Sequence, residues 1–388
     1  MIPDYAPLNT WAEGLVASGR LANTELTVFR KGQTEFTCRH GFMDLAGRRP
    51  LLDNSIFRIY SMTKPIIAVA IMILAEEQLL CLSDPVSGFI PTFSDQFVSQ
   101  ADGERVAADR QITVHDLMSH TAGLTYGGTE HPPVSTSYRA KGIDFSSAYA
   151  DLAEMAAKVG TCDRYYQPGT RWIYSVANDI LGRIIEVASG LSLDTFISQR
   201  ILEPLAMADT GWHVKPQDKA RFVANFGYDS DGCLRDRSAE SEDRYLNGGT
   251  LLSGGGGLVS TSSDYMAFAR MLLAGGTVDG TRILSPRSLA MMTRNQLPGD
   301  LPSMGCPVHS KMDMSGIGYG YGVAVTIDQD KATIGCSNGD FGWGGVANTY
   351  FWVDPREDMI VLFMSQLMPA VAMPIRTDLR KLIYQAIR

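Results

Sequence analysis

Strand patterns lie at the two ends of this 388-residue chain, and helical patterns fill its middle. Near the start, residues 24–29 and 35–40 alternate as half-buried strands do, and Lys31-Gly32-Gln33 between them predicts a hairpin turn. Strand patterns return near the end, at 319–327, 332–336, 346–353 and 359–365. Because hairpins pair antiparallel strands, we expect both ends of the chain to meet in one mostly antiparallel sheet.

The remaining segments with a regular apolar repeat follow helical periodicity. Helices are expected at 8–18, 61–80, 114–119, 146–158, 178–189, 193–202, 263–273 and 370–388. Strands grouped at the ends, rather than alternating with helices, favour an α+β fold: an antiparallel sheet flanked by the N- and C-terminal helices with a large helical insertion. We expect a single unit over 1–388, in which 1–80 and about 320–388 form an α/β subdomain and about 81–319 form a mainly helical region.

Composition and charge narrow the classes of function. A net charge of -8 disfavours nucleic acid or an anionic membrane surface as a partner. The six cysteines are scattered without a C-x-x-C spacing, which is typical of reduced thiols rather than disulfides or a metal site. The N-terminus has no signal-peptide pattern, and the most apolar stretch, 65–74, is too short to span a bilayer. These features predict a soluble, cytoplasmic protein, and they leave its oligomeric state open.

Ser61-Met62-Thr63-Lys64, at the expected start of the 61–80 helix, is the motif that carries chemistry. Residues three apart on a helix share a face, so the Ser61 hydroxyl and the Lys64 amine are expected within hydrogen-bond reach. The helix N-terminus offers free N–H groups to a developing oxyanion, and apolar neighbours after Lys64 favour a neutral, basic amine. A serine N-cap with a solvated lysine one turn later fits the motif alone equally well.

The order of motifs along the chain resembles the β-lactamase and penicillin-binding-protein superfamily, specifically its class C-like branch and the family VIII carboxylesterases. The resemblance runs from about Phe57 to the C-terminus. Its landmarks are Arg58 to Lys64, Leu82-Ser83-Asp84-Pro85-Val86, Ile112 to Leu124, Pro168-Gly169-Thr170, Tyr174-Ser175-Val176, Gly257 to Thr261 and Gly320-Tyr321-Gly322-Val323.

The resemblance implies that Tyr174 is the third catalytic residue, placed beside Lys64 and Ser61 to handle the same proton. Lys-Thr-Gly, the usual third motif, is absent, and Trp343-Gly344-Gly345 stands at the matching position, as in family VIII esterases. The two glycines would let the substrate lie close to this backbone. The N–H of Val346 is then the expected partner of the Ser61 N–H in an oxyanion hole.

Two departures from the superfamily pattern point away from β-lactams and peptides. Trp343 replaces a lysine that would hold a substrate carboxylate, and it supplies an apolar wall instead. Val176 stands where many β-lactam-binding relatives have asparagine. Both changes favour uncharged esters as substrates.

Other motifs are structural by default. Gly335-Cys336-Ser337-Asn338-Gly339 matches the G-x-S-x-G elbow, but no histidine follows Ser337 to complete a triad. His115 and His120 lack a third ligand nearby. The glycine run 254–257 predicts a tight turn leading into a strand. Tyr126 and the loop 301–316, with its methionines, are candidates for lining the pocket.

The sequence therefore predicts a β-lactamase/transpeptidase-like serine esterase that acts on small, short-chain carboxylic esters. Ser61, Lys64 and Tyr174 are the catalytic candidates, Ser61 and Val346 the oxyanion hole, and Trp343, Gly344, Gly345 and Tyr126 the substrate contacts. No metal or organic cofactor is expected, and the partner is the small-molecule ester. A β-lactamase, a D-alanyl peptidase, an acyltransferase and a non-catalytic acyl-ligand binder remain as alternatives.

Overall fold

The structure is a computed structural model that describes residues 3–100, 104–127, 134–143, 151–238, 242–249, 251–305, 312–370 and 373–388. Its centre is a seven-stranded sheet in the order β11-β12-β13-β14-β15-β1-β2, in which every neighbouring pair is antiparallel. The seven strands are β1 (Asn23–Arg30), β2 (Gln33–Gly41), β11 (Ile317–Tyr319), β12 (Ala324–Thr326), β13 (Phe341–Gly344), β14 (Tyr350–Asp354) and β15 (Met359–Met364).

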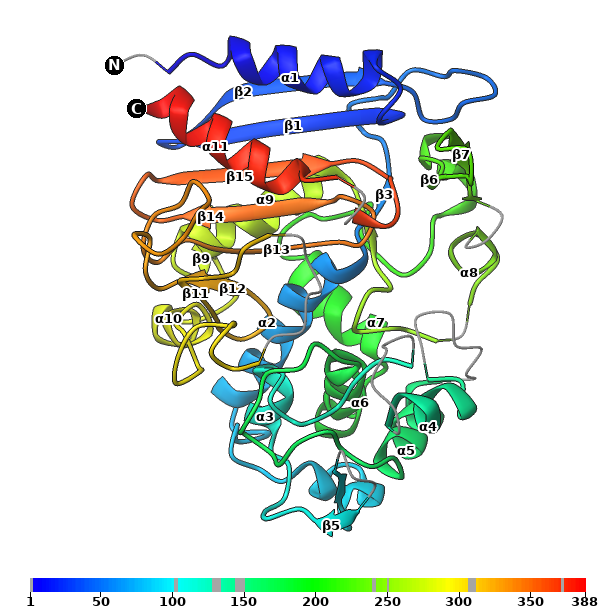
Figure 1. The fold of residues 1–388 in the computed structure, drawn as a ribbon, viewed down its shortest axis with the longest axis vertical. Coiled ribbons are helices and arrows are strands. Elements are labelled where there is room, and N and C mark those ends of the chain that lie inside the picture. The colour runs from blue at the N-terminus through cyan, green and yellow to red at the C-terminus, as the bar shows by residue number, and fades with distance from the viewer. Residues whose placement is uncertain are drawn as a thin grey trace.

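The first and last parts of the chain join in this sheet, as the sequence predicts. The hairpin β1–β2 turns at Lys31 and Gly32, which have φ of 51° and 78°. Strand β1 also pairs along its length with β15, from Glu25 opposite Met364 to Arg30 opposite Met359. This pairing brings both ends of the chain to one side of the molecule (Figure 1).

Helices cover both faces of the sheet because alternate residues of its central strands are apolar. Trp352 and Val361 face a core with α1 and α11, whereas Phe351 and Leu362 face a larger core with α2 and α9. Figure 1 shows α1 and α11 in front of the sheet and α9 behind it. The α-helices are α1 (Ala6–Ala17), α2 (Thr63–Glu76), α3 (Val114–Met118), α4 (Val134–Ala140), α5 (Leu152–Gly160), α6 (Ala177–Ser189), α7 (Leu193–Ile197), α8 (Glu242–Leu246), α9 (Ser262–Leu273), α10 (Pro286–Met292) and α11 (Ile375–Ile387).

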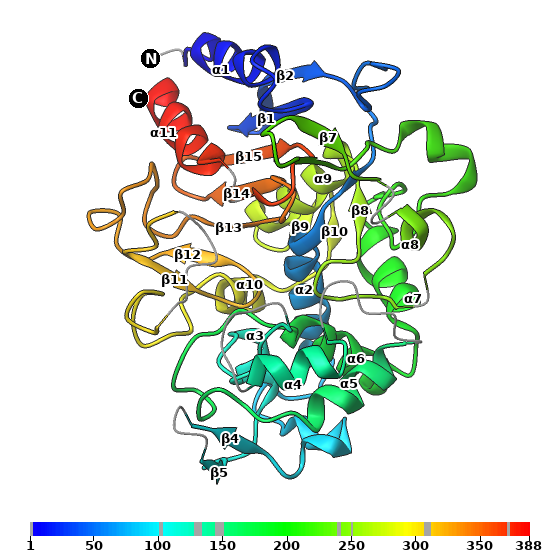
Figure 2. The ribbon, with the colours of Figure 1, turned by 45° about the vertical axis from the view of Figure 1, so that its right-hand side comes forward.

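Helix α2 links the sheet to the helical part of the molecule, where α3 to α6 gather (Figure 2). Its residues from Thr63 to Leu74 are all buried, since α6 and α7 pack on the side away from the sheet. Helix α9 packs on β14 and β15 although the sequence analysis assigned it to the helical region, because the second apolar face of the sheet needs a cover. The single-unit, two-subdomain division stays a prediction.

Short elements complete the fold. Four two-stranded pairs are β3 (Phe57–Arg58) with β8 (Val259–Ser260), β4 (Phe97–Ser99) with β5 (Arg105–Ala107), β6 (Phe226–Tyr228) with β7 (Leu234–Asp236), and β9 (Thr277–Val278) with β10 (Thr281–Arg282). The 3₁₀ turns are η1 (Tyr60–Met62), η2 (Val86–Gly88), η3 (Pro91–Phe93) and η5 (Pro216–Arg221), and η4 (Ser198–Leu202) is a π-helical turn that continues α7.

The predicted strands near the C-terminus are wrong in three places. Residues 319–327 form two strands, because Gly322 at φ 74° turns the chain against α2. Residues 332–336 form no strand, and Gly335 packs against the backbone of α11 instead. The 346–353 strand begins only at Tyr350, after Asn348 adopts φ 64°.

Several predicted helices have different ends in the structure. Helix α2 starts at Thr63 rather than at 61. Helix α11 starts at Ile375, directly after Pro374. Helix α5 starts at Leu152, and the expected first turn at 146–150 lies outside the described residues.

Candidate active site

Ser61 lies at the junction between a short strand and the buried helix α2. Strand β3 pairs with β8, and the N–H of Ile59 donates to the carbonyl of Leu258 at 3.1 Å. Tyr60 has φ of 45°, a left-handed conformation that non-glycine residues adopt at a cost in free energy. One 3₁₀ turn, η1, follows before α2 begins at Thr63. Ser61 is therefore held on a strained turn ahead of the helix, not in its first α-helical turn.

The Lys64 side chain reaches Ser61 inside the protein. Its ammonium donates to Ser61 Oγ at 3.1 Å and to the carbonyl of Gly255 at 2.6 Å, and Lys64 is 0% exposed. Its Nζ also lies 4.5 Å from the ring centroid of Tyr174 and 5.9 Å from that of Tyr126. The spacing of three residues thus brings serine and lysine together, and the surrounding groups leave the amine little freedom.

A buried carboxylate, missed by the sequence analysis, stands behind Lys64. Asp179 Oδ1 accepts hydrogen bonds from the Ser253 hydroxyl at 2.6 Å and from the Gly255 N–H at 3.0 Å. Burial raises the pKa of Asp179, and these two hydrogen bonds and the nearby Lys64 charge oppose the increase. A side chain at Gly255 would collide with the carboxylate, so the predicted glycine turn also shapes the seat of Lys64.

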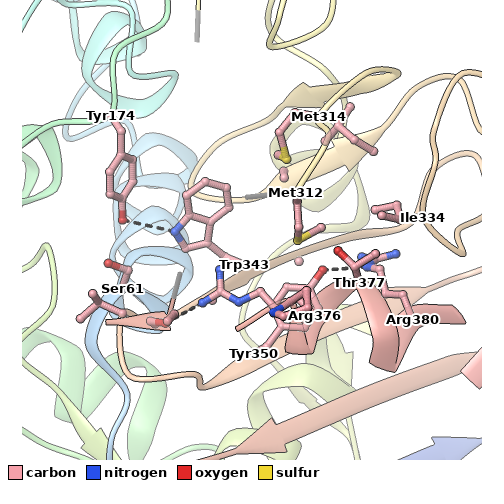
Figure 3. Close-up of a pocket in the computed structure, with 18 of the residues that line it drawn as sticks. Ser61, Tyr174, Met312, Met314, Ile334, Trp343, Tyr350, Arg376, Thr377 and Arg380 are labelled. Atoms are coloured by element: carbon pink, nitrogen blue, oxygen red, sulfur yellow. Dashed lines mark hydrogen bonds between the residues drawn. The ribbon is translucent and has the colours of Figure 1, made fainter. Parts of the chain in front are cut away.

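Tyr174 lies on the other side of Ser61, in a group of aromatic rings. The Trp343 indole N–H donates to the Tyr174 hydroxyl at 3.3 Å, and the two ring centroids are 5.5 Å apart. His120, Trp172 and Tyr126 also contact the Tyr174 ring, at centroid distances of 5.0, 6.1 and 5.7 Å. Figure 3 shows the Tyr174 hydroxyl directed toward Ser61. The structure therefore brings together the three catalytic candidates.

Trp343 and Gly344 belong to strand β13, rather than preceding a strand as the sequence analysis expected. They pair with Phe351 and Tyr350 of β14. The glycines hide the strand pattern, because they lack the side chains from which β-propensity is read.

Val346 follows two residues after the end of β13. An oxyanion hole requires N–H groups that are not already bonded within the backbone. In the described residues, no backbone acceptor bonds the N–H of Val346 or of Ser61. Both residues line the same pocket.

That pocket has a volume of about 500 Å³ and extends from Ser61 past Trp343 to helix α11 (Figure 3). Tyr126, Met312 and Met314 line it, as the sequence analysis proposed for that tyrosine and for the methionine loop. Met304, in the same loop, is not among the lining residues and is buried in the cluster on which Met312 and Met314 pack, and 306–311 lie outside the described residues. The pocket is mostly apolar, and burial keeps the pKa of Tyr126 well above its usual value.

The pocket also contains a cation that the sequence analysis did not expect. Arg376, from the first turn of α11, donates through Nη2 to the carbonyl of Gly345 at 2.6 Å. Its guanidinium lies where a side chain at residue 344 would be, within 2.6 Å of the Cβ position. A side chain at residue 344 would therefore displace the flexible end of Arg376. Gly344 and Gly345 both line the pocket, and their contact with substrate stays a prediction. Burial lowers the pKa of Arg376, and the nearby Tyr350 and Tyr174 oppose the decrease.

The other sequence motifs do not reach the pocket. Ser337 sits in a turn whose N–H donates to Asp340, and a strand rather than a helix follows it. His115 bonds the Tyr321 hydroxyl at 2.7 Å, and His120 bonds Ser175 at 3.2 Å. No group of three or more potential metal ligands exists in the described part of the chain. None of the helices described there has the length and apolarity that a membrane crossing requires.

Known proteins resemble this chain in sequence and in fold. A profile of the family described as Beta-lactamase matches residues 8–385. An uncharacterised protein of Mycobacterium tuberculosis is 32% identical over 340 residues, covering 85% of this chain and 82% of its own. Esterase EstB of Burkholderia gladioli is 27% identical over 385 residues, covering 94% and 91%. The structure of EstCE1, "a hydrolase with promiscuous acyltransferase activity", superposes with a TM-score of 0.80 at 25% identity, covering 97% of this chain and 96% of that one.

The antiparallel sheet, the helices on its two faces and the serine beside a buried lysine define a protein of the β-lactamase and penicillin-binding-protein fold. Esterases and acyl-transfer enzymes among its relatives support a serine hydrolase or acyl-transfer activity. The chain belongs to the Beta-lactamase family.

Proposed function

We propose that this protein is a serine carboxylesterase of the family VIII type, with Ser61 as nucleophile and Lys64 and Tyr174 as its acid–base pair. The observation that carries the proposal is the 3.1 Å contact between buried Lys64 Nζ and Ser61 Oγ at the edge of an apolar pocket. The likeness to esterase EstB supports ester hydrolysis as the reaction.

In the proposed mechanism, Ser61 Oγ attacks the ester carbonyl while its hydroxyl proton moves to the Lys64–Tyr174 pair, of which one member starts deprotonated and accepts it. The same pair passes that proton to the departing alcohol, which leaves an acyl-enzyme. The N–H groups of Ser61 and Val346 stabilise the oxyanion of each tetrahedral intermediate. Water then attacks the acyl group by the reverse proton route and releases the carboxylic acid.

Trp343 is proposed to contact the substrate, and its indole N–H holds the Tyr174 hydroxyl at 3.3 Å. Trp343 removes the lysine that would hold a substrate carboxylate, but an arginine elsewhere in the pocket can take its place. Arg376 supplies such a cation on the neighbouring helix α11. The β-lactamase alternative therefore stays open on this point.

An acyltransferase is the second candidate function. The pocket wall is mostly apolar, which suits an alcohol acceptor as well as water. EstCE1, at 25% identity, is described as a hydrolase with promiscuous acyltransferase activity. Product analysis with added alcohol distinguishes the two activities, because transfer yields a new ester whereas hydrolysis yields the acid.

A panel of 4-nitrophenyl esters tests the esterase proposal. The pocket of about 500 Å³ exceeds the needs of an acetyl group, so kcat/KM is expected to rise by up to about fourfold per added methylene. This increase should stop where the acyl chain fills the pocket. If kcat/KM instead falls with each methylene added to the acetate ester, the enzyme prefers short-chain esters, as the sequence predicts. No hydrolysis together with no fluorophosphonate labelling of Ser61 would reject the proposal, and a chromogenic cephalosporin turned over as well as the best ester would favour a β-lactamase.

Asp179 is expected to act by positioning Lys64 through Gly255. Asp179→Ala should lower kcat by about tenfold or more and the free energy of unfolding by about 1–3 kcal/mol, because two buried donors lose their acceptor. Asp179→Asn keeps an acceptor oxygen and should restore most of both losses. Steady-state kinetics and urea unfolding of the two variants provide the measurement. Equal kcat in wild type and Asp179→Ala would exclude the positioning role.

A further inference from the structure

Among the described residues, Arg376 is a cation without an acidic partner at the wall of the pocket that holds Ser61. We propose that Arg376 binds a carboxylate of the substrate, so that the preferred ester carries an acidic group in addition to the scissile bond. This inference rests on the proposed esterase function, which it makes more specific.

The guanidinium of Arg376 has unused hydrogen-bond donors. Its Nη2 donates to the Gly345 carbonyl at 2.6 Å. Its Nε is enclosed by protein atoms and has no hydrogen-bond partner. Its Nη1 is not enclosed and bonds no group in the described residues, so this nitrogen is available to a ligand in the pocket.

Arg380, one turn later on α11, has the ion-pair partner that Arg376 lacks in the described residues. Its Nη1 pairs with Asp340 at 2.8 Å and also donates to the Gly335 carbonyl, and its Nε donates to the Tyr350 hydroxyl at 2.7 Å. Arg376 forms no ion pair within the described part of the chain. The contrast lies in the charge partner, since both arginines line the same pocket.

The charge balance of the pocket favours an anionic ligand. Asp340 is the acidic residue among the described lining residues, and Arg380 and the Tyr384 hydroxyl already bond it. Arg376 therefore leaves one positive charge uncompensated. Apolar side chains such as Met312, Met314 and Ile334 form much of the remaining wall, and such surroundings strengthen a charge-assisted hydrogen bond.

The location of Arg376 places the anion site near the reacting bond. Its guanidinium packs on Gly344 and bonds Gly345, the residue before the proposed oxyanion donor Val346. Figure 3 shows the Arg376 side chain extending from α11 toward Ser61 beneath Trp343. A carboxylate on Arg376 and an ester carbonyl at Ser61 can thus belong to one small molecule.

Two matched substrate pairs test the proposal in the wild-type protein. The first pair is mono-4-nitrophenyl adipate and its methyl ester, which differ in a carboxylate on the acyl side. The second pair is 4-(butanoyloxy)benzoate and the corresponding benzamide, which differ on the alcohol side. We expect the anionic member of at least one pair to have a kcat/KM higher by about tenfold or more, mainly through KM. Equal efficiencies within both pairs would overturn the proposal.

Variants on α11 distinguish an anion site from a backbone clamp. Arg376→Gln should bring the ratio of kcat/KM for the anionic ester to that for the neutral ester close to one, beyond any loss that both esters share through the Gly345 backbone, and Arg376→Lys should retain part of the preference. Lys381→Gln, which changes an exposed cation on the same helix, is the matched control and should behave as wild type. If Arg376→Gln lowers both members of a pair equally, Arg376 only holds the Gly344–Gly345 backbone, and the proposal fails.

Direct binding separates this inference from the esterase proposal. Hexanoate and hexanamide are titrated into wild type and Arg376→Gln, with tryptophan fluorescence as the signal, because Trp343 lies over the site. Hexanoate should bind wild type about tenfold or more tightly than hexanamide does, and Arg376→Gln should abolish the difference. If hexanoate binds more tightly than hexanamide but no ester is hydrolysed, the esterase proposal fails and the anion site stands. Ester turnover with equal binding of the two ligands would reject the anion site alone.

Discussion

Ser61→Ala is expected to lower ester hydrolysis by about four to six orders of magnitude, to the level that binding and the oxyanion groups sustain alone. The substitution removes the attacking oxygen, which the Lys64 ammonium contacts at 3.1 Å. Measurement of kcat/KM with 4-nitrophenyl butyrate, with fluorophosphonate labelling in parallel, checks this outcome.

Ser337→Ala is the control for that experiment, since Ser337 lies in the competing G-x-S-x-G motif. Its loop contributes no serine to the pocket, and its N–H donates to Asp340. We expect this variant to keep most of the activity and all of the labelling. A dead Ser337→Ala enzyme beside an active Ser61→Ala enzyme would contradict the assignment of the nucleophile.

Lys64→Ala and Tyr174→Phe are each expected to lower kcat by at least about a hundredfold, the usual scale of lost acid–base assistance. Lys64 Nζ lies 4.5 Å from the centroid of the Tyr174 ring, so both groups face one hydroxyl proton. The double variant should therefore lose much less than the product of the two single losses. A double-mutant cycle in kcat provides the test.

Full additivity in that cycle would show that Lys64 and Tyr174 act on different steps. Thermal unfolding of each variant serves as a control, because Lys64→Ala leaves the buried Gly255 carbonyl without its donor. Tyr174→Phe removes only the hydroxyl that accepts from Trp343, so its effect on stability should be smaller.

The parts of the fold that local patterns control could be predicted from the sequence. The β1–β2 hairpin follows from Gly32 and the alternation on each side, and the contact of Ser61 with Lys64 follows from their spacing. Strand β13 was not predicted from the sequence because two of its residues, Gly342 and Gly344, are glycines. Its existence depends on pairing with β14, which no local pattern of 341–344 records.

The missed site residues have a similar explanation. Asp179 acts on Lys64 through Gly255, and Arg376 acts on the backbone of Gly345, so each role depends on a contact far along the chain. Neither residue has a motif of its own. The glycines of Trp343-Gly344-Gly345 indicate that some group lies close to this backbone, but they do not tell a substrate from a side chain such as Arg376.

The pairing of β1 with β15 has a consequence for how the protein is made. Glu25 pairs with Met364, so the first hairpin cannot enter the sheet until almost the whole chain has been synthesised. At about 5–20 residues per second, this delay is roughly 15 to 70 s on the ribosome. During that time Leu26 and Val28, which are fully buried in the folded protein, have no partner strand. Productive folding therefore depends on keeping an emerged apolar hairpin from associating with other chains, and shortening the C-terminus by the last strand should leave the protein insoluble.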